Sequence, residues 1–552
     1  MTIQEQRRAW MDCPAMTDEL LAELNSMDSD TANDSFYRTL AFGTGGLRGV
    51  LGAGTNRMNL FTVMQATRGL ANYLKESFPD PSCAVSCDSR IHSRDFAELT
   101  AAVMASMGVR VYLYPRLQPT PMLSYAVRRL NTSGGVMITA SHNPAKFNGY
   151  KVYGPDGCQI TLETADRVQK LISEEPVLAD RLPDLSEYLA SGMVTYIGED
   201  IIEDYYQAIW KLRIHPSSEP LRLVYSPLNG AGNVPVREIL RRMGNIRVDI
   251  VKEQENPDGN FPTCPYPNPE FREAMQLAIE KTLETGADMC LATDPDSDRM
   301  AAGVRDGDRV EIVSGNDMGV LMIDYLCRNT APRGGLPRVV VTTIVSTDMA
   351  DAVCAKYGAE LRRVLTGFKF ICEQIHFLEE EGHPERFLFG FEESYGYLSG
   401  TDVRDKDAVN AALLACEMAA NLKAEGKTLL DRLEELRKEF GFFAQRTLNF
   451  EYPGENGAKQ MAAIMAGLRA PLASYSAPEI ASAARKDYLL DDTGLPKSDV
   501  LEFRLASGMK FVVRPSGTEP KLKAYLFARG ADEPAASAEL DRLEALVTSL
   551  CK

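Results

Sequence analysis

Strand-length apolar segments alternate with segments of helical periodicity along this chain of 552 residues. The first such region has strands predicted at 84–87, 109–114 and 136–139, with a helix in each gap. We expect Thr120 to cap the second helix, because Pro121 then takes the first helical position. This β-α-β-α-β order predicts a mostly parallel sheet covered by helices.

The same order recurs twice before the character of the chain changes. Further strands are predicted at 221–225, 246–251, 289–292, 339–345, 361–365 and 387–389, and in the tail at 501–505, 509–513 and 523–527. The sequence therefore predicts three consecutive α/β domains with mixed or parallel sheets, plus a smaller C-terminal α+β domain, around one central cleft. The expected boundaries are 1–203, 204–312, 313–440 and 441–552.

Charge and cysteine content exclude several classes of protein. With 60 Lys+Arg against 77 Asp+Glu, the net charge of −17 argues against a nucleic-acid partner. No apolar run is long enough for a membrane span, and the N-terminal segment lacks the apolar core of a signal peptide. The 11 cysteines form no CxxC pair, which argues against a disulfide framework or a structural zinc site. We expect a soluble, cytoplasmic protein.

Each α/β unit ends in a polar loop, and ligands of open α/β sheets collect at the carboxyl ends of strands. The loop at 139–144, TASHNP, presents Ser141, which is either a nucleophile or a serine that caps a turn. A hydrolase is disfavoured, because the chain has no GxSxG elbow and because the side chains of sequence neighbours such as Ser141 and His142 rarely face each other.

The loop at 294–299, DPDSDR, holds three carboxylates. In an extended conformation Asp294, Asp296 and Asp298 share one side of the chain, where they repel one another unless a cation is bound. Oxygen ligands favour Mg²⁺ or Ca²⁺, and Mg²⁺ is preferred here. An EF-hand is excluded because Arg299 and Arg305 stand where its glycine and glutamate are required.

Two further loops offer groups for a sugar phosphate. In the loop at 390–396, Glu392 and Ser394 provide acceptors and a donor for vicinal hydroxyls, although the loop could equally be a charged turn. In the loop at 514–520, an arginine, two hydroxyls and a glycine suit a phosphate dianion, with a plain tight turn as the alternative. A nucleophile, a metal loop, a polyol loop and a phosphate loop together indicate phosphoryl transfer on a sugar phosphate.

These loops carry a family resemblance. The chain resembles the α-D-phosphohexomutase superfamily over nearly its full length, with matching motifs at 45–49, 139–144, 294–299, 366–369, 392–394 and 514–518. The stretches GFEESYGY and RPSGTEPKLKAYL look most like the phosphoglucomutase/phosphopentomutase branch.

The resemblance implies a mechanism and its residues. Ser141 would be phosphorylated and would ligate Mg²⁺ together with Asp294, Asp296 and Asp298. Glucose 1-phosphate and glucose 6-phosphate would interconvert, with glucose 1,6-bisphosphate as intermediate and activator. The remaining implied residues are Arg48, His142, Lys151 and Arg299 around the transfer site, Lys406 for proton transfer, Thr366, Gly367, Glu392 and Ser394 at the sugar, and Arg514, Ser516, Gly517 and Thr518 at the non-transferring phosphate.

Other activities stay open at this level. A phosphopentomutase, a phosphomannomutase and a non-catalytic sugar-phosphate sensor share the same loops. Phe391 stands where the common form of the sugar loop has glycine, so a bulky ring is expected to narrow the pocket or to favour a pentose. We also expect the tail domain to close over the cleft, since a reorienting bisphosphate must be kept from water. The expected partners are small sugar phosphates, and the sequence does not reveal the oligomeric state.

Overall fold

The computed structural model describes every residue except 44, 333–334, 453–455, 517–520 and 552. The chain forms two compact units. The first unit comprises Met1–Gly315, Ile375–Phe387 and Ser394–Glu425. The second comprises Asn316–Gln374, Leu388–Glu393 and Gly426–Lys552.

The first sheet of the first unit is mixed. Its strands are β1 (Gly46–Val50), β2 (Ser82–Cys87), β3 (Arg110–Leu113), β4 (Gly134–Ile138), β5 (Phe147–Tyr153) and β6 (Val194–Tyr196), in the order β1-β5-β4-β2-β3-β6. Strand β2 pairs in parallel with β3 and β4, as predicted. Strand β5, which the sequence did not indicate, runs antiparallel to β4 and β1.

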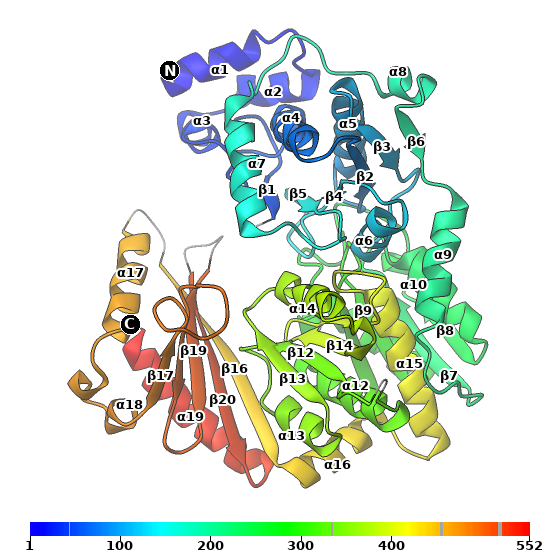
Figure 1. Cartoon of the computed structure of the whole chain (residues 1–552), viewed down its shortest axis with the longest axis vertical. Helices are drawn as coiled ribbons and strands as arrows, with labels where there is room; N and C mark the ends of the chain where they lie inside the picture. Colours follow the sequence, from blue (N-terminus) through cyan, green and yellow to red (C-terminus); the bar gives the residue numbers. More distant parts are fainter. Residues whose placement is uncertain (44, 333–334, 453–455, 517–520, 552) are drawn as a thin grey trace. The chain divides into compact units, whose positions relative to one another are not determined.

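Helices cover this sheet (Figure 1). They are α1 (Ile3–Met11), α2 (Asp18–Ser26), α3 (Ser29–Phe36), α4 (Leu60–Ser77), α5 (Ser93–Ser106), α6 (Thr120–Arg129), α7 (Leu162–Glu174) and α8 (Leu185–Ala190). Helix α4 packs against α5 and α7. The periodic side chains Phe96, Leu99 and Val103 of α5 are buried, as their spacing predicts.

The second sheet of the first unit has the order β11-β10-β9-β7-β8. Its strands are β7 (Leu221–Ser226), β8 (Ile246–Ile250), β9 (Met289–Thr293), β10 (Met300–Asp306) and β11 (Arg309–Val313). The associated helices are α9 (Glu199–Trp210), α10 (Asn233–Met243), α11 (Arg272–Thr285) and α15 (Ala408–Ala424), with the short strand β15 (Gly396–Ser399) against α15. The predicted strands pair in parallel, and the unpredicted β10–β11 hairpin extends the sheet.

The second unit contains the third α/β region. Strand β12 (Val339–Thr343) lies between β13 (Glu360–Val364) and β14 (Phe387–Glu392), and pairs in parallel with β13. The helices of this region are α12 (Gly315–Asn329), α13 (Met349–Lys356), α14 (Phe368–Glu380) and α16 (Leu429–Phe440).

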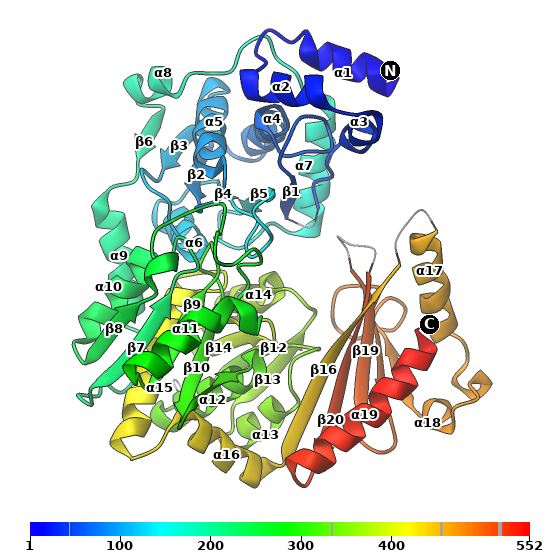
Figure 2. The same ribbon diagram turned by 180° about the vertical axis from the view of Figure 1, so that it is seen from behind.

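The C-terminal region of the second unit is α+β. An antiparallel sheet, in the order β16-β20-β19-β18-β17, comprises β16 (Phe442–Glu451), β17 (Ala484–Asp487), β18 (Leu501–Arg504), β19 (Lys510–Pro515) and β20 (Lys521–Gly530). Helices α17 (Gly457–Leu468) and α18 (Pro478–Ala481) precede β17, and α19 (Glu533–Leu550) crosses one face of the sheet (Figure 2). Three α/β regions followed by an antiparallel domain confirm the expected fold class.

Among the residues that the structure describes, no helix has both the length and the apolar character needed to cross a bilayer.

Candidate active site

Ser141 follows β4 directly and is buried in the first unit. Its backbone is left-handed, with φ of 54°, a conformation that is strained for any residue with a Cβ. The Ser141 amide donates to Oγ1 of Thr139 at 2.7 Å, and its hydroxyl donates to Oδ2 of Asp294 at 3.0 Å. Backbone strain held by surrounding contacts is typical of functional positions.

His142 approaches the same hydroxyl, with Nδ1 at 3.1 Å from Oγ of Ser141. The expectation that these neighbours do not face each other is therefore wrong. Burial, together with the positive charges of Arg299 and Arg48, holds the pKa of His142 well below its usual value. A neutral imidazole beside Ser141 adds no charge to the site at neutral pH.

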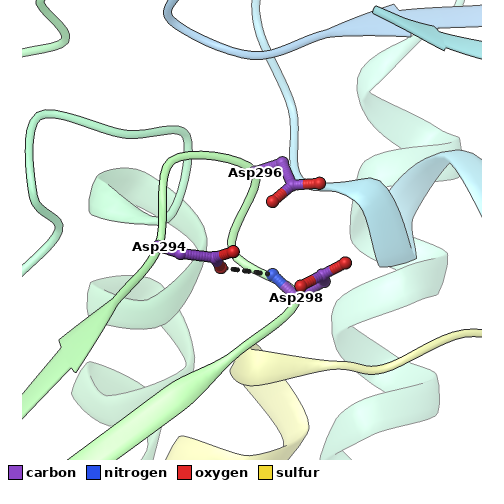
Figure 3. A group of neighbouring side chains, drawn as sticks. All are labelled: Asp294, Asp296 and Asp298. Carbon is purple, nitrogen blue, oxygen red and sulfur yellow. Dashed lines mark hydrogen bonds between the residues drawn. The ribbon is translucent and has the colours of Figure 1, made fainter. Parts of the chain in front are cut away.

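The three aspartates come from the loop between β9 and β10 (Figure 3), and one carboxylate oxygen of each lies within 4.8 Å of the other two. The loop is a turn rather than the expected extended segment. The amide of Ser297, whose φ is 50°, donates to the carbonyl of Asp294 at 2.9 Å. Oδ1 of Asp294 accepts from the amide of Asp298 at 3.1 Å. Turning the chain brings the carboxylates together more closely than an extended strand, where residues i and i+4 are far apart.

Two lysines offset the charge of this cluster. Nζ of Lys151, on β5, lies 2.7 Å from Oδ2 of Asp296 and 3.5 Å from Oδ2 of Asp298. Nζ of Lys406 lies 3.2 Å from the same oxygen of Asp298.

The shifts in pKa follow from this arrangement. Burial and the neighbouring carboxylate of Asp296 raise the pKa of Asp294 well above its usual value. Burial also raises the pKa of Asp298, with Asp296 adding to the effect. Burial opposes ionisation of Asp296 as well, but the ammonium group of Lys151 outweighs it and lowers the pKa of that carboxyl.

The donor set fits a divalent cation. In the described part of the chain, Oδ1 of Asp296 and Oδ1 of Asp298 are buried without a hydrogen-bond partner. Buried carboxylate oxygens normally have a partner, and a hard cation satisfies them. The aspartate cluster is therefore suited to Mg²⁺, which prefers oxygen ligands.

Thr120 takes part in this cluster and does not cap its helix. Pro119 is the N-cap of α6, and the Thr120 hydroxyl donates to Oδ2 of Asp296 at 2.8 Å. The Thr120 amide donates to the carbonyl of Asp296 at 2.9 Å. The cap expected from the sequence is wrong because this threonine bonds to a distant loop.

The other expected residues of the first unit lie near these groups. Arg48, on β1, donates to Oδ1 of Asn143 at 3.2 Å, and Arg299 pairs with Glu270. Lys406 is also 3.2 Å from Oδ1 of Asp405. Ser394 precedes Tyr395, whose carbonyl accepts from the amide that begins β10 at 3.1 Å. The first unit thus joins the nucleophile loop, the aspartate cluster and both lysines.

The second unit holds Thr366, Gly367, Glu392, Arg514 and Ser516, whereas Gly517 and Thr518 lie outside the described residues.

A residue that the sequence did not single out is Glu393. Its Oε2 accepts hydrogen bonds from the hydroxyls of Thr343 at 3.2 Å and Ser346 at 3.4 Å. Burial and the adjacent Glu392 raise the pKa of Glu393 to about 7. Its position directly after a buried strand is the feature of the sequence that could have identified it.

Phe391 corrects an expectation about sugar selectivity. Its ring is fully buried and stacks on Phe389, with centroids 5.9 Å apart. It also packs so closely on Gly319 of α12 that a Cβ there would lie 2.3 Å from the ring. Because alternate residues of a strand face opposite sides, Phe391 points into the core and not toward a ligand on the side of Glu392.

Comparisons with family models and with curated proteins point to the same family. Family models for the α/β/α domains I, II and III of phosphoglucomutase/phosphomannomutase match residues 39–177, 203–307 and 314–440. A phosphoglucomutase of Staphylococcus haemolyticus is 36% identical over 523 residues, covering 92% of this chain and 94% of that protein.

Two solved structures share the fold. The open form of pp63/parafusin, a phosphoglucomutase from Paramecium, aligns with a TM-score of 0.70 at 18% identity, covering 93% of this chain and 95% of the other. Aspergillus fumigatus N-acetylphosphoglucosamine mutase, in complex with GlcNAc-6P and magnesium, aligns with a TM-score of 0.54 at 16% identity, covering 94% and 97%.

Proposed function

Since the chain belongs to the phosphoglucomutase/phosphomannomutase family of the α-D-phosphohexomutase superfamily, we propose that it is a Mg²⁺-dependent phosphoglucomutase that interconverts glucose 1-phosphate and glucose 6-phosphate. The observation that carries this proposal is the Ser141 hydroxyl, 3.0 Å from a carboxylate of the buried aspartate cluster. The name of the Staphylococcus haemolyticus relative supports the choice of glucose phosphate.

The aspartate cluster would hold Mg²⁺, as the buried oxygens of Asp296 and Asp298 that accept no hydrogen bond suggest. Bound there, the ion would neutralise charge on the transferring phosphoryl group. The magnesium in the complex of the Aspergillus mutase supports this choice of metal for the family fold.

Ser141 carries the phosphoryl group between the two positions of the sugar. In the first half-reaction the bond between phosphorus and Oγ of Ser141 breaks, and a bond forms to the free hydroxyl oxygen of the bound sugar monophosphate. Lys406, in its neutral amine form, would take the proton of that hydroxyl at Nζ. The resulting glucose 1,6-bisphosphate reorients, its other phosphoryl group returns to Oγ, and the proton returns to the sugar oxygen. The same bisphosphate, added externally, phosphorylates Ser141 and acts as activator.

The remaining residues bind and orient the substrate. Arg48, His142, Lys151 and Arg299 would surround the transferring group, Thr366, Gly367, Glu392 and Ser394 would contact the sugar, and Arg514, Ser516, Gly517 and Thr518 would hold the other phosphate. Positioning of this kind supplies much of the acceleration in phosphoryl transfer.

Three further statements belong to the proposal. The domain boundaries are 1–203, 204–312, 313–440 and 441–552. The partners are small sugar phosphates. The protein is cytoplasmic, which agrees with its 11 buried, free cysteines.

Turnover of a panel of 1-phosphates of glucose, mannose, ribose and deoxyribose, each with trace bisphosphate, tests the assignment. We expect the largest kcat/KM for glucose 1-phosphate and no turnover by Ser141→Ala. A pentose preference would establish a phosphopentomutase, and a mannose preference a phosphomannomutase. Binding without turnover by the wild type would establish a sensor. Full turnover by Ser141→Ala would refute the mechanism.

A further inference from the structure

Arg90 is a buried arginine that faces the nucleophile loop from the end of β2. Its guanidinium donates to three backbone carbonyls of that loop and to the carbonyl of Phe147, the first residue of β5. The acceptors are the carbonyl oxygens of Ser141 at 2.5 Å, Asn143, Pro144 at 3.0 Å and Phe147 at 3.0 Å. One rigid, planar side chain thereby fixes the loop at several points, including the peptide that follows the nucleophile.

Asp88 holds Arg90 and the loop together. Its Oδ2 lies 3.4 Å from Nε of Arg90 and accepts from the Thr139 hydroxyl at 2.6 Å. The same threonine oxygen accepts from the amide of Ser141. The ring of Phe261 also covers the guanidinium, with the ring centroid 5.1 Å from the guanidinium carbon. Both peptide groups that flank Ser141 are therefore tied, directly or through one residue, to the Asp88–Arg90 pair.

We propose that Arg90, held by Asp88, is a positioning residue that keeps Ser141 in its left-handed conformation and aims its hydroxyl at the aspartate cluster. The inference rests on the proposed function, in which that hydroxyl carries the phosphoryl group. The left-handed conformation is disfavoured for any residue with a Cβ, so the loop would relax without such contacts. A shift of about 1 Å in a reacting group lowers turnover by about 100-fold.

A matched pair of variants separates positioning from general stability. Arg338 is also buried and donates to backbone carbonyls, those of Cys327 at 2.9 Å, Thr330 and Tyr357 at 3.4 Å, but in the second unit. Arg90→Lys and Arg338→Lys each leave a single ammonium in place of a planar fork with several donors.

We expect both variants to be less stable than the wild type, and only Arg90→Lys to lose catalysis. Its kcat should fall about 10–100-fold with KM within about threefold, and Ser141 should take up phosphate from glucose 1,6-bisphosphate more slowly. Hydrogen exchange should quicken in residues 139–147 of Arg90→Lys and stay unchanged there in Arg338→Lys. Unchanged kcat and unchanged exchange in Arg90→Lys would overturn the inference.

A second variant and a readout that does not depend on turnover complete the test. If Arg90→Lys does not fold, Asp88→Asn takes its place. We expect the kcat of Asp88→Asn to fall about 10-fold and hydrogen exchange in its residues 139–147 to quicken. Wild-type values of both kcat and exchange would overturn the inference. If the wild type shows no mutase turnover, the proposed function fails, whereas exchange in residues 139–147 still decides whether Arg90 fixes the loop.

Discussion

Replacement of Lys151 by methionine removes the cation nearest to the aspartate cluster and keeps an unbranched side chain only one atom shorter. In the wild type the ammonium group lies 2.7 Å from Asp296 and 3.5 Å from Asp298, and both carboxylates are buried. Removing one partner of a buried ion pair destabilises a protein by about 3–5 kcal/mol. Because Lys406 still contacts Asp298, we expect the lower end of that range, about 3 kcal/mol, in the presence of EDTA.

The pH dependence has a definite sign. Lys151 lowers the pKa of Asp296 in the folded protein, so this carboxylate stabilises the fold above its unfolded pKa of 3.8, and the contribution disappears as the pH falls through the folded pKa. The stability difference between wild type and Lys151→Met should therefore be full at neutral pH and shrink in acid. Mg²⁺ at a fixed, saturating concentration should also reduce the difference, because the variant lacks the ammonium group that competes with the ion and should bind Mg²⁺ more tightly. Binding that is tenfold tighter than in the wild type adds about 1.4 kcal/mol to the stability of the variant alone.

Urea titration followed by tryptophan fluorescence measures this change. Both tryptophans, Trp10 and Trp210, lie in the first unit, so the signal reports that unit. Arg116→Met is the control, since its pair with Glu199 is 64% and 74% exposed and should contribute little. Equal stability losses in Lys151→Met and Arg116→Met, with no response to Mg²⁺, would refute the electrostatic reasoning.

Three other variants give separate tests. Because the pKa of Glu393 is raised from 4.5 to about 7, the free energy of unfolding of the second unit should fall by roughly 3 kcal/mol as the pH rises through this interval. Calorimetry of Glu393→Gln should show no such fall, and an unchanged fall would contradict the assignment. Phe391→Leu should lower stability by about 1–2 kcal/mol without changing the ratio of kcat/KM for glucose and ribose 1-phosphates, because the ring is in the core; a tenfold shift toward ribose would contradict its placement. Lys406→Met should lower kcat by about 100-fold or more in steady-state assays, and wild-type kcat would remove it from proton transfer.

Local pattern was sufficient for much of the fold. Strand β2 and helix α5 follow from a buried apolar run and from helical spacing. Strand β5 did not, because it buries polar side chains: Asn148 is fully buried and donates to the carbonyl of Ile91 at 2.9 Å. Strand β16 has no fully buried residue, so its pattern carried little contrast.

The candidate site was predictable where its chemistry is concentrated in one loop. The nucleophile and the three aspartates stand next to strand ends, and the structure brings them together. The contact of Thr120 with Asp296 and the contacts of Arg90 with the nucleophile loop were missed because the partners are 176 and 51 residues away, respectively, and nothing local indicates these contacts. The orientation of Phe391 likewise depends on contact with a different helix.

The central claim is that the Ser141 hydroxyl accepts and donates a phosphoryl group. Intact-mass and peptide mass spectrometry after incubation with glucose 1,6-bisphosphate and Mg²⁺ tests it most directly. We expect one added phosphate, located on Ser141, and we expect it to be replaced by a labelled phosphoryl group when glucose 1-phosphate carrying heavy-oxygen-labelled phosphate is added to an enzyme freed of bisphosphate. An unmodified Ser141 in a preparation that turns over substrate, or a phosphate on another residue, would contradict the account.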